Sequence, residues 1–219
     1  MQQFAGWLRL IAVMVCLSAF AGTAGAQVAG KDFQAVNPVQ PTETGNKVEV
    51  IEFFSYACPH CSSLQAPLRT WLKRKSADVE FRRIPAIFQE NWVPFARIYY
   101  TLEAMGLVDK LHHDVFAAVH EQKVRLQETK VLFDWVATKG VDKQKFADTY
   151  NSFSVQSRTQ RAVDLTRRYA IEFTPALVVE GRYLTGPSMT STGNTVDYDR
   201  FFKVLDQLIA TARKTRSGK

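Results

Sequence analysis

Residues 48–61 read VEVIEFFSYACPHC, a β-branched and aromatic run that ends in two closely spaced cysteines. The first half of it, Val48–Phe54, predicts a central β-strand. Pro59 suits the first turn of a helix, where the N–H that proline lacks would have no partner anyway. The apolar residues behind it recur at helical spacing along one stripe: Cys61, Leu64, Leu68, Trp71 and Leu72. The pattern therefore places Cys58 at the exposed mouth of a helix and Cys61 on its shielded side.

The rest of the chain supplies further strands on either side of a long helical stretch. These strands are expected near Phe33–Val39, at Asp78–Ile84, at Ala176–Val179 and at Arg182–Leu184. Between residues 86 and 170 apolar side chains recur at helical spacing, and Gly140 stands where one of these helices should end. A last helix carries the apolar residues of 201–209, and the basic residues after Ala212 are expected to form a frayed, solvated end.

The order of these elements is strand, strand, helix, strand, helical block, strand, strand, helix, which predicts an α/β fold. It resembles a thioredoxin-like fold with an inserted helical domain, and the helix between two strands of one sheet satisfies the right-handed crossover rule. We expect a signal peptide at 1–26, the first part of the thioredoxin-like domain at 27–85, the helical insertion at 86–170 and the second part of the thioredoxin-like domain at 171–219.

The N-terminus has the layout of a secretory signal peptide. Arg9 gives a thin positive region, Leu10–Ala21 is almost wholly apolar, and the small residues at 24–26 offer a cleavage site before Gln27. An uncleaved membrane anchor is the alternative, but the apolar run is about a dozen residues long, whereas a membrane span needs roughly 20. We therefore expect an exported protein.

The composition is that of an ordinary globular protein. Of the 219 residues, 46% are hydrophobic and 22% are charged, which argues against a disordered or fibrous chain. The net charge of +7 comes from 28 basic and 21 acidic residues, and no dense basic block precedes the tail. A nucleic-acid partner is therefore not expected.

The cysteine count favours redox chemistry over a structural role. Cys16 leaves with the signal peptide, so the mature chain keeps only Cys58 and Cys61. A disulfide that closes so short a loop constrains the unfolded chain very little. A zinc site is the competing interpretation, but structural zinc needs four ligands, and the other candidates are His60, His112, His113 and His120. We expect no bound metal and no cofactor.

A cysteine at the start of a helix has the properties of a reactive thiolate. The unpaired N–H groups and the positive end of the helix dipole stabilise the sulfur anion of Cys58 and lower its pKa. His60 lies in the same turn and, when cationic, adds a favourable charge; the alternative is an exposed residue without redox influence. A low thiolate pKa stabilises the reduced form, so the oxidised protein would give its disulfide away readily.

The pair Thr174-Pro175 directly precedes the strand expected at Ala176–Val179. Proline at the first position of a strand is common at a sheet edge and has no functional role in that setting. The functional alternative is a cis-proline loop beside the two sulfurs. In that case the backbone of Thr174 would pair with a substrate strand, and Pro175, which has no N–H, would shield the disulfide from metal ligation.

Glu52 shares one face of its strand with apolar neighbours, so its carboxyl group should be partly buried beneath the cysteines. Burial raises the pKa of a carboxyl group and would allow it to exchange protons with Cys61. The alternative is a structural acid paired with Arg82 or Arg83.

Together these residues resemble the DsbA family of periplasmic thiol:disulfide interchange proteins. The similarity rests on EFFSYACPHC at 52–61 and on FTPA at 173–176, and it extends over essentially the whole mature chain. The resemblance implies that Cys58 is the nucleophile and Cys61 the resolving thiol.

By the same resemblance, His60, which follows Pro59 in the CPHC motif, tunes the cysteine pair. Pro175 would be the cis-proline and Glu52 the buried acid of the family. The chain departs from the best-known enterobacterial members at Thr174, where they carry valine.

The activity implied is that of a protein disulfide oxidoreductase, which donates the Cys58–Cys61 disulfide to unfolded or reduced exported proteins. A DsbB-like, quinone-linked membrane oxidase would reoxidise it. Two alternatives remain: a disulfide isomerase or reductase of the same fold, and a non-catalytic periplasmic chaperone. Such isomerases usually carry an extra dimerisation domain, for which the mature chain leaves little room, so we expect a monomer.

Overall fold

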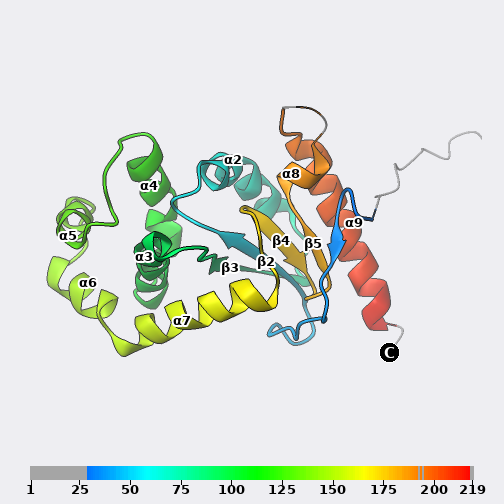
Figure 1. The fold of residues 1–219 in the computed structure, drawn as a ribbon, viewed down its shortest axis with the longest axis horizontal. Helices are drawn as coiled ribbons and strands as arrows, with labels where there is room; N and C mark the ends of the chain where they lie inside the picture. Colours follow the sequence, from blue (N-terminus) through cyan, green and yellow to red (C-terminus); the bar gives the residue numbers. More distant parts are fainter. Residues whose placement is uncertain (1–28, 192, 194, 218–219) are drawn as a thin grey trace, which may run out of the picture.

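A computed structural model describes residues 29–191, 193 and 195–217, so the expected signal peptide and its cleavage site lie outside the described residues. At the centre is a five-stranded sheet with the strand order β1-β5-β4-β2-β3 (Figure 1). Its strands are β1 (Gln34–Ala35), β2 (Val48–Phe54), β3 (Val79–Pro85), β4 (Ala176–Val179) and β5 (Tyr183–Thr185). β1 is shorter than the sequence predicts, because Pro38 has no N–H with which to continue the ladder.

Strand β2 is the central strand, and all seven of its residues are buried. It pairs in parallel with β3 and antiparallel with β4. The parallel pair is connected by helix α2 (Pro59–Arg74), which carries both cysteines of the motif at its start. In this register Glu52 lies opposite Arg83.

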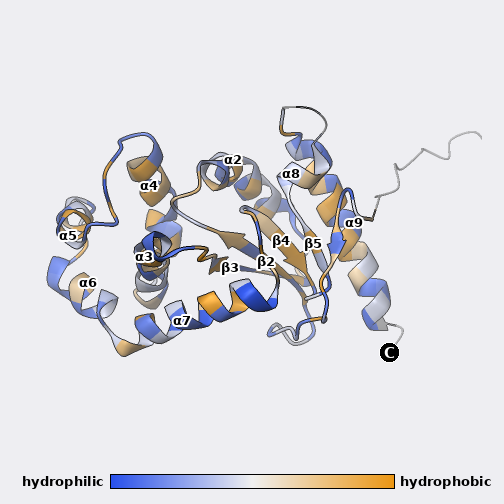
Figure 2. Cartoon of the chain, viewed as in Figure 1, coloured by the Kyte–Doolittle hydropathy of each residue, from blue (hydrophilic) through white to orange (hydrophobic). Residues whose placement is uncertain are grey.

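Helices cover both faces of the sheet. On one face, Val48 and Val50 pack with the apolar side of α2 and with α9 (Tyr198–Ser217). On the other face, Ile51 and Phe53 pack against the helices that follow β3. The alternation along β2 therefore divides the core into two layers. Figure 2 shows hydrophobic residues along β4 and part of β2, and both hydrophobic and hydrophilic residues along the helices around them.

The segment between β3 and β4 is helical, as its periodicity predicts. It contains η1 (Glu90–Trp92), α3 (Val93–Ala104), α4 (Val108–His120), α5 (Thr129–Thr138), α6 (Lys143–Tyr150) and α7 (Phe153–Arg168). Helices α3 to α6 form a group beside the sheet, and α7 returns along it to β4 (Figure 1). A short helix, α8 (Pro187–Thr190), precedes α9.

The expectation that the chain frays directly after Ala212 is wrong, because residues 213–217 are helical. Helix α9 continues to Ser217, because its arginines find acceptors at one end of the sheet. Arg213 makes two hydrogen bonds with Asp78, at 2.6 and 2.7 Å. Arg216 donates to the carbonyl of Lys47 at 2.6 Å and to Glu180 at 2.8 Å. Within residues 29–191, 193 and 195–217, no helix combines the length and the apolar character needed to cross a membrane.

Candidate active site

Cys58 is the N-cap residue of α2, directly after the central strand. Its sulfur accepts a hydrogen bond from the backbone N–H of Cys61 at 3.4 Å. The preceding turn is held by Ser55, whose carbonyl accepts from the N–H of Cys58 at 3.0 Å and whose hydroxyl accepts from that of Ala57. The N-terminus of the helix therefore points its free donors at one sulfur atom.

The two sulfurs differ sharply in proton affinity. The pKa of Cys58 is lowered to about 5, first by a hydrogen bond from the Cys61 thiol and further by the side chain of Thr174 and by backbone N–H groups, against the opposing effect of burial. Burial raises the pKa of Cys61 well above its ordinary value, and the neighbouring Cys58 sulfur raises it further. At neutral pH the reduced site therefore holds one thiolate, on Cys58, and one thiol, on Cys61.

Cys58 is less accessible than the sequence predicts. Cys58 is 7% exposed and Cys61 is fully buried. Cys58 is therefore the more accessible of the two cysteines, as expected, but it is largely covered. The cover comes from the chain before β4, because the sulfur of Cys58 lies 3.4 Å from the carbonyl oxygen of Thr174. Pro59 and His60 are exposed at the start of α2, and His60 acts on the pKa of Cys58 through its backbone N–H.

The loop before β4 reaches the cysteines across 116 positions of sequence. The peptide bond between Thr174 and Pro175 is cis, so the loop is of the kind that the functional alternative describes. Gly186 packs against it: a Cβ there would lie 2.6 Å from the ring of Phe173 and 2.9 Å from the carbonyl oxygen of Pro175. The close approach requires glycine, a constraint that the sequence did not reveal.

Glu52 is fully buried on β2 and pairs with Arg83, whose Nε lies 2.9 Å from its Oε2. Burial raises the pKa of Glu52, although Arg83 acts in the opposite direction. The neighbouring Arg82 pairs instead with Glu49 and Glu43. The other oxygen of Glu52, Oε1, has no partner of good hydrogen-bond geometry within the described part of the chain.

A chain of buried polar groups next to the cysteines was not singled out from the sequence as a unit. The hydroxyl of Tyr56 lies 2.7 Å from Nδ1 of His112, and Nε2 of the same ring lies 3.1 Å from Oε1 of Gln65. The amide nitrogen of Gln65 donates to the carbonyl of Cys61 at 3.0 Å. On α4, His120 also contacts the backbone carbonyl of Tyr56, at 2.8 Å. Helix α4 therefore holds Tyr56, two residues before Cys58, at its hydroxyl and at its carbonyl.

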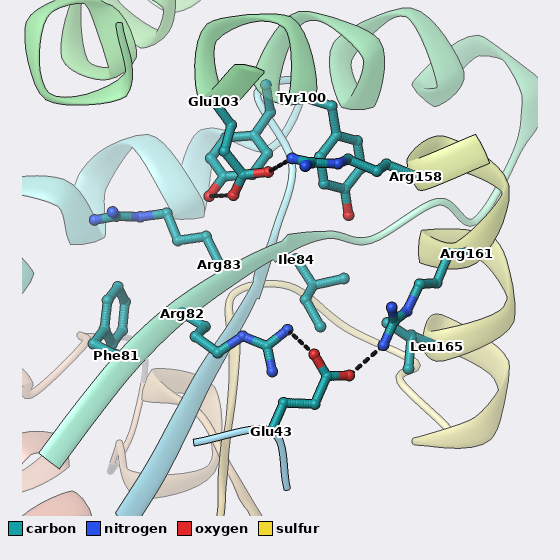
Figure 3. Close-up of a pocket in the computed structure, with 11 residues that line it drawn as sticks. Glu43, Phe81, Arg82, Arg83, Ile84, Tyr100, Glu103, Arg158, Arg161 and Leu165 are labelled. Atoms are coloured by element: carbon teal, nitrogen blue, oxygen red, sulfur yellow. Dashed lines mark hydrogen bonds and ion pairs between the residues drawn. The ribbon is translucent and has the colours of Figure 1, made fainter. Parts of the chain in front are cut away.

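A charged cleft of about 420 Å³ lies between β3, α3 and α7 (Figure 3). Its arginines are paired within the protein, since Glu43 binds both Arg82 and Arg161, and Arg158 binds Glu103. Figure 3 shows Arg83 extending away from Glu43, and Arg83 pairs with Glu52 instead. Each arginine of the cleft therefore has a carboxylate partner, and the residues that line the cleft do not include the two cysteines.

Among the residues that the structure describes, His, Cys, Asp and Glu side chains form no group of three or more able to hold a metal ion. Cys58 and Cys61 are both free thiols. The chemistry that the site offers is that of its two sulfurs, one of low and one of high proton affinity.

Comparison with known proteins matches this arrangement. A thioredoxin family model matches residues 43–212. The thiol:disulfide interchange protein DsbA of Bordetella parapertussis is 40% identical over 203 residues, which cover 93% of this chain and 94% of the relative. The chain belongs to the DsbA family. DsbA of Pseudomonas aeruginosa is 35% identical over 176 residues, covering 80% of this chain and 83% of that protein.

Solved structures of the family confirm the predicted fold. The crystal structure of Pseudomonas aeruginosa DsbA superposes with a TM-score of 0.81 at 32% identity, covering 87% of this chain and 97% of that chain. The reduced DsbA1 of Neisseria meningitidis gives 0.77 at 26% identity, covering 89% of this chain and all of that chain. The protein thus has a thioredoxin-like fold with a helical insertion, and it is a thiol:disulfide oxidoreductase of the DsbA family.

Proposed function

We propose that the protein donates the Cys58–Cys61 disulfide to reduced, unfolded proteins after their export to the periplasm. The observation that carries this direction is the contrast between the two sulfurs, since the pKa of Cys58 is about 5 and that of Cys61 is well above normal. The stabilised thiolate lowers the free energy of the reduced form relative to the oxidised form. The oxidised protein therefore transfers its disulfide readily to a substrate.

The exchange runs in two balanced steps. A substrate thiolate attacks the sulfur of Cys58, the S–S bond breaks, and Cys61 leaves with the electron pair and takes up a proton. A second substrate thiolate attacks the substrate sulfur of the mixed disulfide, and Cys58 leaves as a thiolate. The substrate is oxidised by two electrons and the protein is reduced by the same two. A DsbB-like, quinone-linked membrane oxidase removes them again.

The surrounding residues take supporting roles in this proposal. The backbone of Thr174 pairs with the substrate segment, and Pro175, which has no N–H, shields the sulfurs from metal ligation. His60 and Pro59 form the exposed turn that the substrate meets. Glu52 supplies or accepts the proton of Cys61, because its pKa is raised and its charge influences that sulfur.

A cleft beside the exchange turn offers a contact surface for the substrate. It has a volume of about 310 Å³ and begins at Ala57, next to Cys58. Its apolar lining comes from Trp92, Phe95 and Val124 of the helical segment. Such a surface holds an unfolded chain loosely and without regard to its sequence.

The proposed site of action follows from the N-terminal sequence. We infer that residues 1–26 direct export and are removed before Gln27, which leaves a monomeric enzyme in the periplasm. Mass measurement of the protein recovered from the periplasm checks the cleavage position, and gel filtration checks the monomer.

Redox equilibration with glutathione tests the direction of exchange. We expect the protein to remain reduced in buffers that leave thioredoxin-like reductants oxidised. An equilibrium at the reducing potentials typical of thioredoxin would contradict the oxidase and favour a reductase.

Replacement of the nucleophile separates catalysis from mere binding. Cys58→Ser should abolish oxidation of a reduced, unfolded substrate, whereas Thr70→Ala, exposed on the same helix, should oxidise it at the wild-type rate. If Cys58→Ser still promoted recovery of the substrate as well as the wild type, the protein would be a chaperone. Preferential reshuffling of scrambled disulfides would instead support an isomerase.

A further inference from the structure

The cleft that begins at Ala57 combines an apolar lining with two cations. The apolar side chains come from η1, α3, α4 and the segment after α4, and Lys123 and Arg125 line the cleft beside them. None of the described residues that line the cleft is acidic. The apolar lining does not distinguish one unfolded chain from another, whereas charges of a single sign do.

Both cations are available to a carboxylate from another chain. The side chain of Lys123 is exposed and, within the described part of the chain, makes no hydrogen bond or ion pair. Arg125 pairs with Glu128 at 2.8 Å, but the side chains are 71% and 44% exposed. So exposed a pair contributes little to stability, and its arginine can therefore bind a second carboxylate at little cost.

The backbone holds Lys123 in a conformation that lysine seldom adopts. Its φ is 58°, in the left-handed region, where glycine and asparagine are favoured. The turn closes through the N–H of Val124, which donates to the carbonyl of Ala118 at 2.8 Å, so the lysine side chain starts from a fixed point. Local backbone preference does not account for a lysine here, and residues in such conformations concentrate at functional sites.

The cleft lies within reach of any segment that reacts with Cys58. Ala57, which lines the cleft, is the residue directly before Cys58, and consecutive Cα atoms are about 3.8 Å apart. A substrate that presents a cysteine to Cys58 therefore brings the residues next to that cysteine to the cleft. Trp92 of the lining also contacts the ring of Phe88, which is 41% exposed, so the apolar surface continues beyond the cleft.

We propose that this cleft selects substrate segments in which an apolar side chain and a carboxylate lie within a few residues of the reacting cysteine. The apolar side chain enters the cleft, and Lys123 and Arg125 bind the carboxylate. The inference rests on the proposed oxidase function and adds a substrate class to it. The selection acts on the capture of the substrate and leaves the exchange chemistry of the two sulfurs unchanged.

The test compares three peptides, each with two copies of Xaa-Leu-Cys-Leu-Xaa joined by a glycine-serine linker. Xaa is glutamate, glutamine or lysine. The second-order rate constant for oxidation by the disulfide form of the protein is measured at low ionic strength. It is divided by the rate constant of the same peptide with hydroxyethyl disulfide, a neutral oxidant, because a flanking charge also changes the pKa of the peptide thiol.

With the wild-type protein we expect the glutamate peptide to react roughly two- to fivefold faster than the glutamine peptide, as an exposed ion pair allows. The lysine peptide should react more slowly than both. Added salt should reduce the differences, because it screens charges at the surface.

Variants that remove one charge each locate the preference. Lys123→Gln and Arg125→Gln keep a polar side chain, and in the double variant the ratio of the glutamate to the glutamine rate constant should fall to about one. Lys203→Gln makes the same change of net charge at an exposed position of α9, which covers the other face of the sheet. This control should keep the wild-type ratio.

Equal corrected rate constants for the three peptides with the wild-type protein would overturn the inference. A glutamate preference that persists in the double variant would do the same, as would one that Lys203→Gln reduces equally, because the net charge of the whole chain would then be its source. Failure of the wild-type protein to oxidise any of the peptides would contradict the proposed function itself, and the inference with it.

Discussion

At the scale of single residues, function depends on the difference between two sulfur atoms three positions apart. Cys58 accepts donors from the start of α2, whereas Cys61 is fully buried and burial raises its pKa. The depressed pKa of Cys58 has a consequence for stability. An ionised group of lowered pKa stabilises the folded state above the folded pKa, and this contribution is lost as the pH falls through that value.

We therefore expect the reduced protein to be more stable than the oxidised protein at pH 7 and to lose this advantage near pH 5. At pH 7 the thiol of Cys58 is ionised when folded and protonated when unfolded, which adds roughly 2 kcal/mol after allowance for solvent screening. Urea unfolding of both redox forms at pH 7 and pH 4 measures the gap. An equal difference in unfolding free energy between the two redox forms at both pH values would show that the Cys58 thiolate does not stabilise the reduced protein.

Thr174 gives a second prediction at this scale. Its side chain lowers the pKa of Cys58, and Thr174→Val removes the hydroxyl while keeping the branched shape. We expect the pKa of Cys58 to rise and the protein to become a weaker oxidant. Ultraviolet absorbance of the thiolate measures the first effect and glutathione equilibration the second. A variant with an unchanged pKa would show that the hydroxyl does not act on the sulfur.

At the scale of elements, helix α7 is stabilised by a cap that makes no contact with the exchange site. The N-cap residue of α7 is Ser152, whose hydroxyl accepts from the N–H of Val155 at 3.3 Å. Ser152→Ala should lower the free energy of unfolding by about 1 kcal/mol, with the exchange rate unchanged. Ser154→Ala, exposed in the first turn of the same helix, is the matched control. Urea titration of both variants compares them, and equal losses would argue against the cap.

The last helix carries a comparable contact. Arg216 donates to the carbonyl of Lys47 and to Glu180, and so ties the end of α9 to the turn before β2. Arg216→Ala leaves the largely buried carboxylate of Glu180 without this partner, and we expect a loss of about 1–2 kcal/mol in unfolding free energy. Lys214→Ala, at an exposed position two residues earlier, should change stability little. Denaturant titration distinguishes the two.

At the scale of the whole molecule, the sequence predicted what depends on neighbours along the chain. The strand at Val48–Phe54 and the helix that begins at Pro59 are found where the local pattern places them. The fold class and the family followed from the motif and were confirmed. The short β1 and the continuation of α9 beyond Ala212 were not predicted, because each depends on what a distant segment offers as a hydrogen-bond partner.

The candidate site was likewise predictable where it depends on a local motif and not where it depends on distant contacts. A motif of four residues identified Cys58 and Cys61, and the structure brings Thr174 and Pro175 beside them. The partner of Glu52 stayed open between two arginines until the strand register placed Arg83 opposite it. The contacts of His112 span 56 and 47 positions of sequence. They depend on how α4 packs against α2, which no local pattern encodes.

The position of β2 between β3 and β4 also bears on how the protein comes into being. Its two neighbours are separated in sequence by the whole helical insertion. A polypeptide delivered from its N-terminus therefore has one side of β2 open, with its valine, isoleucine and phenylalanine residues, until residues 176–179 arrive. Open strand edges invite pairing with foreign strands. The nascent chain can therefore pair with foreign strands until β4 is synthesised, and the length of the insertion sets how long this period lasts.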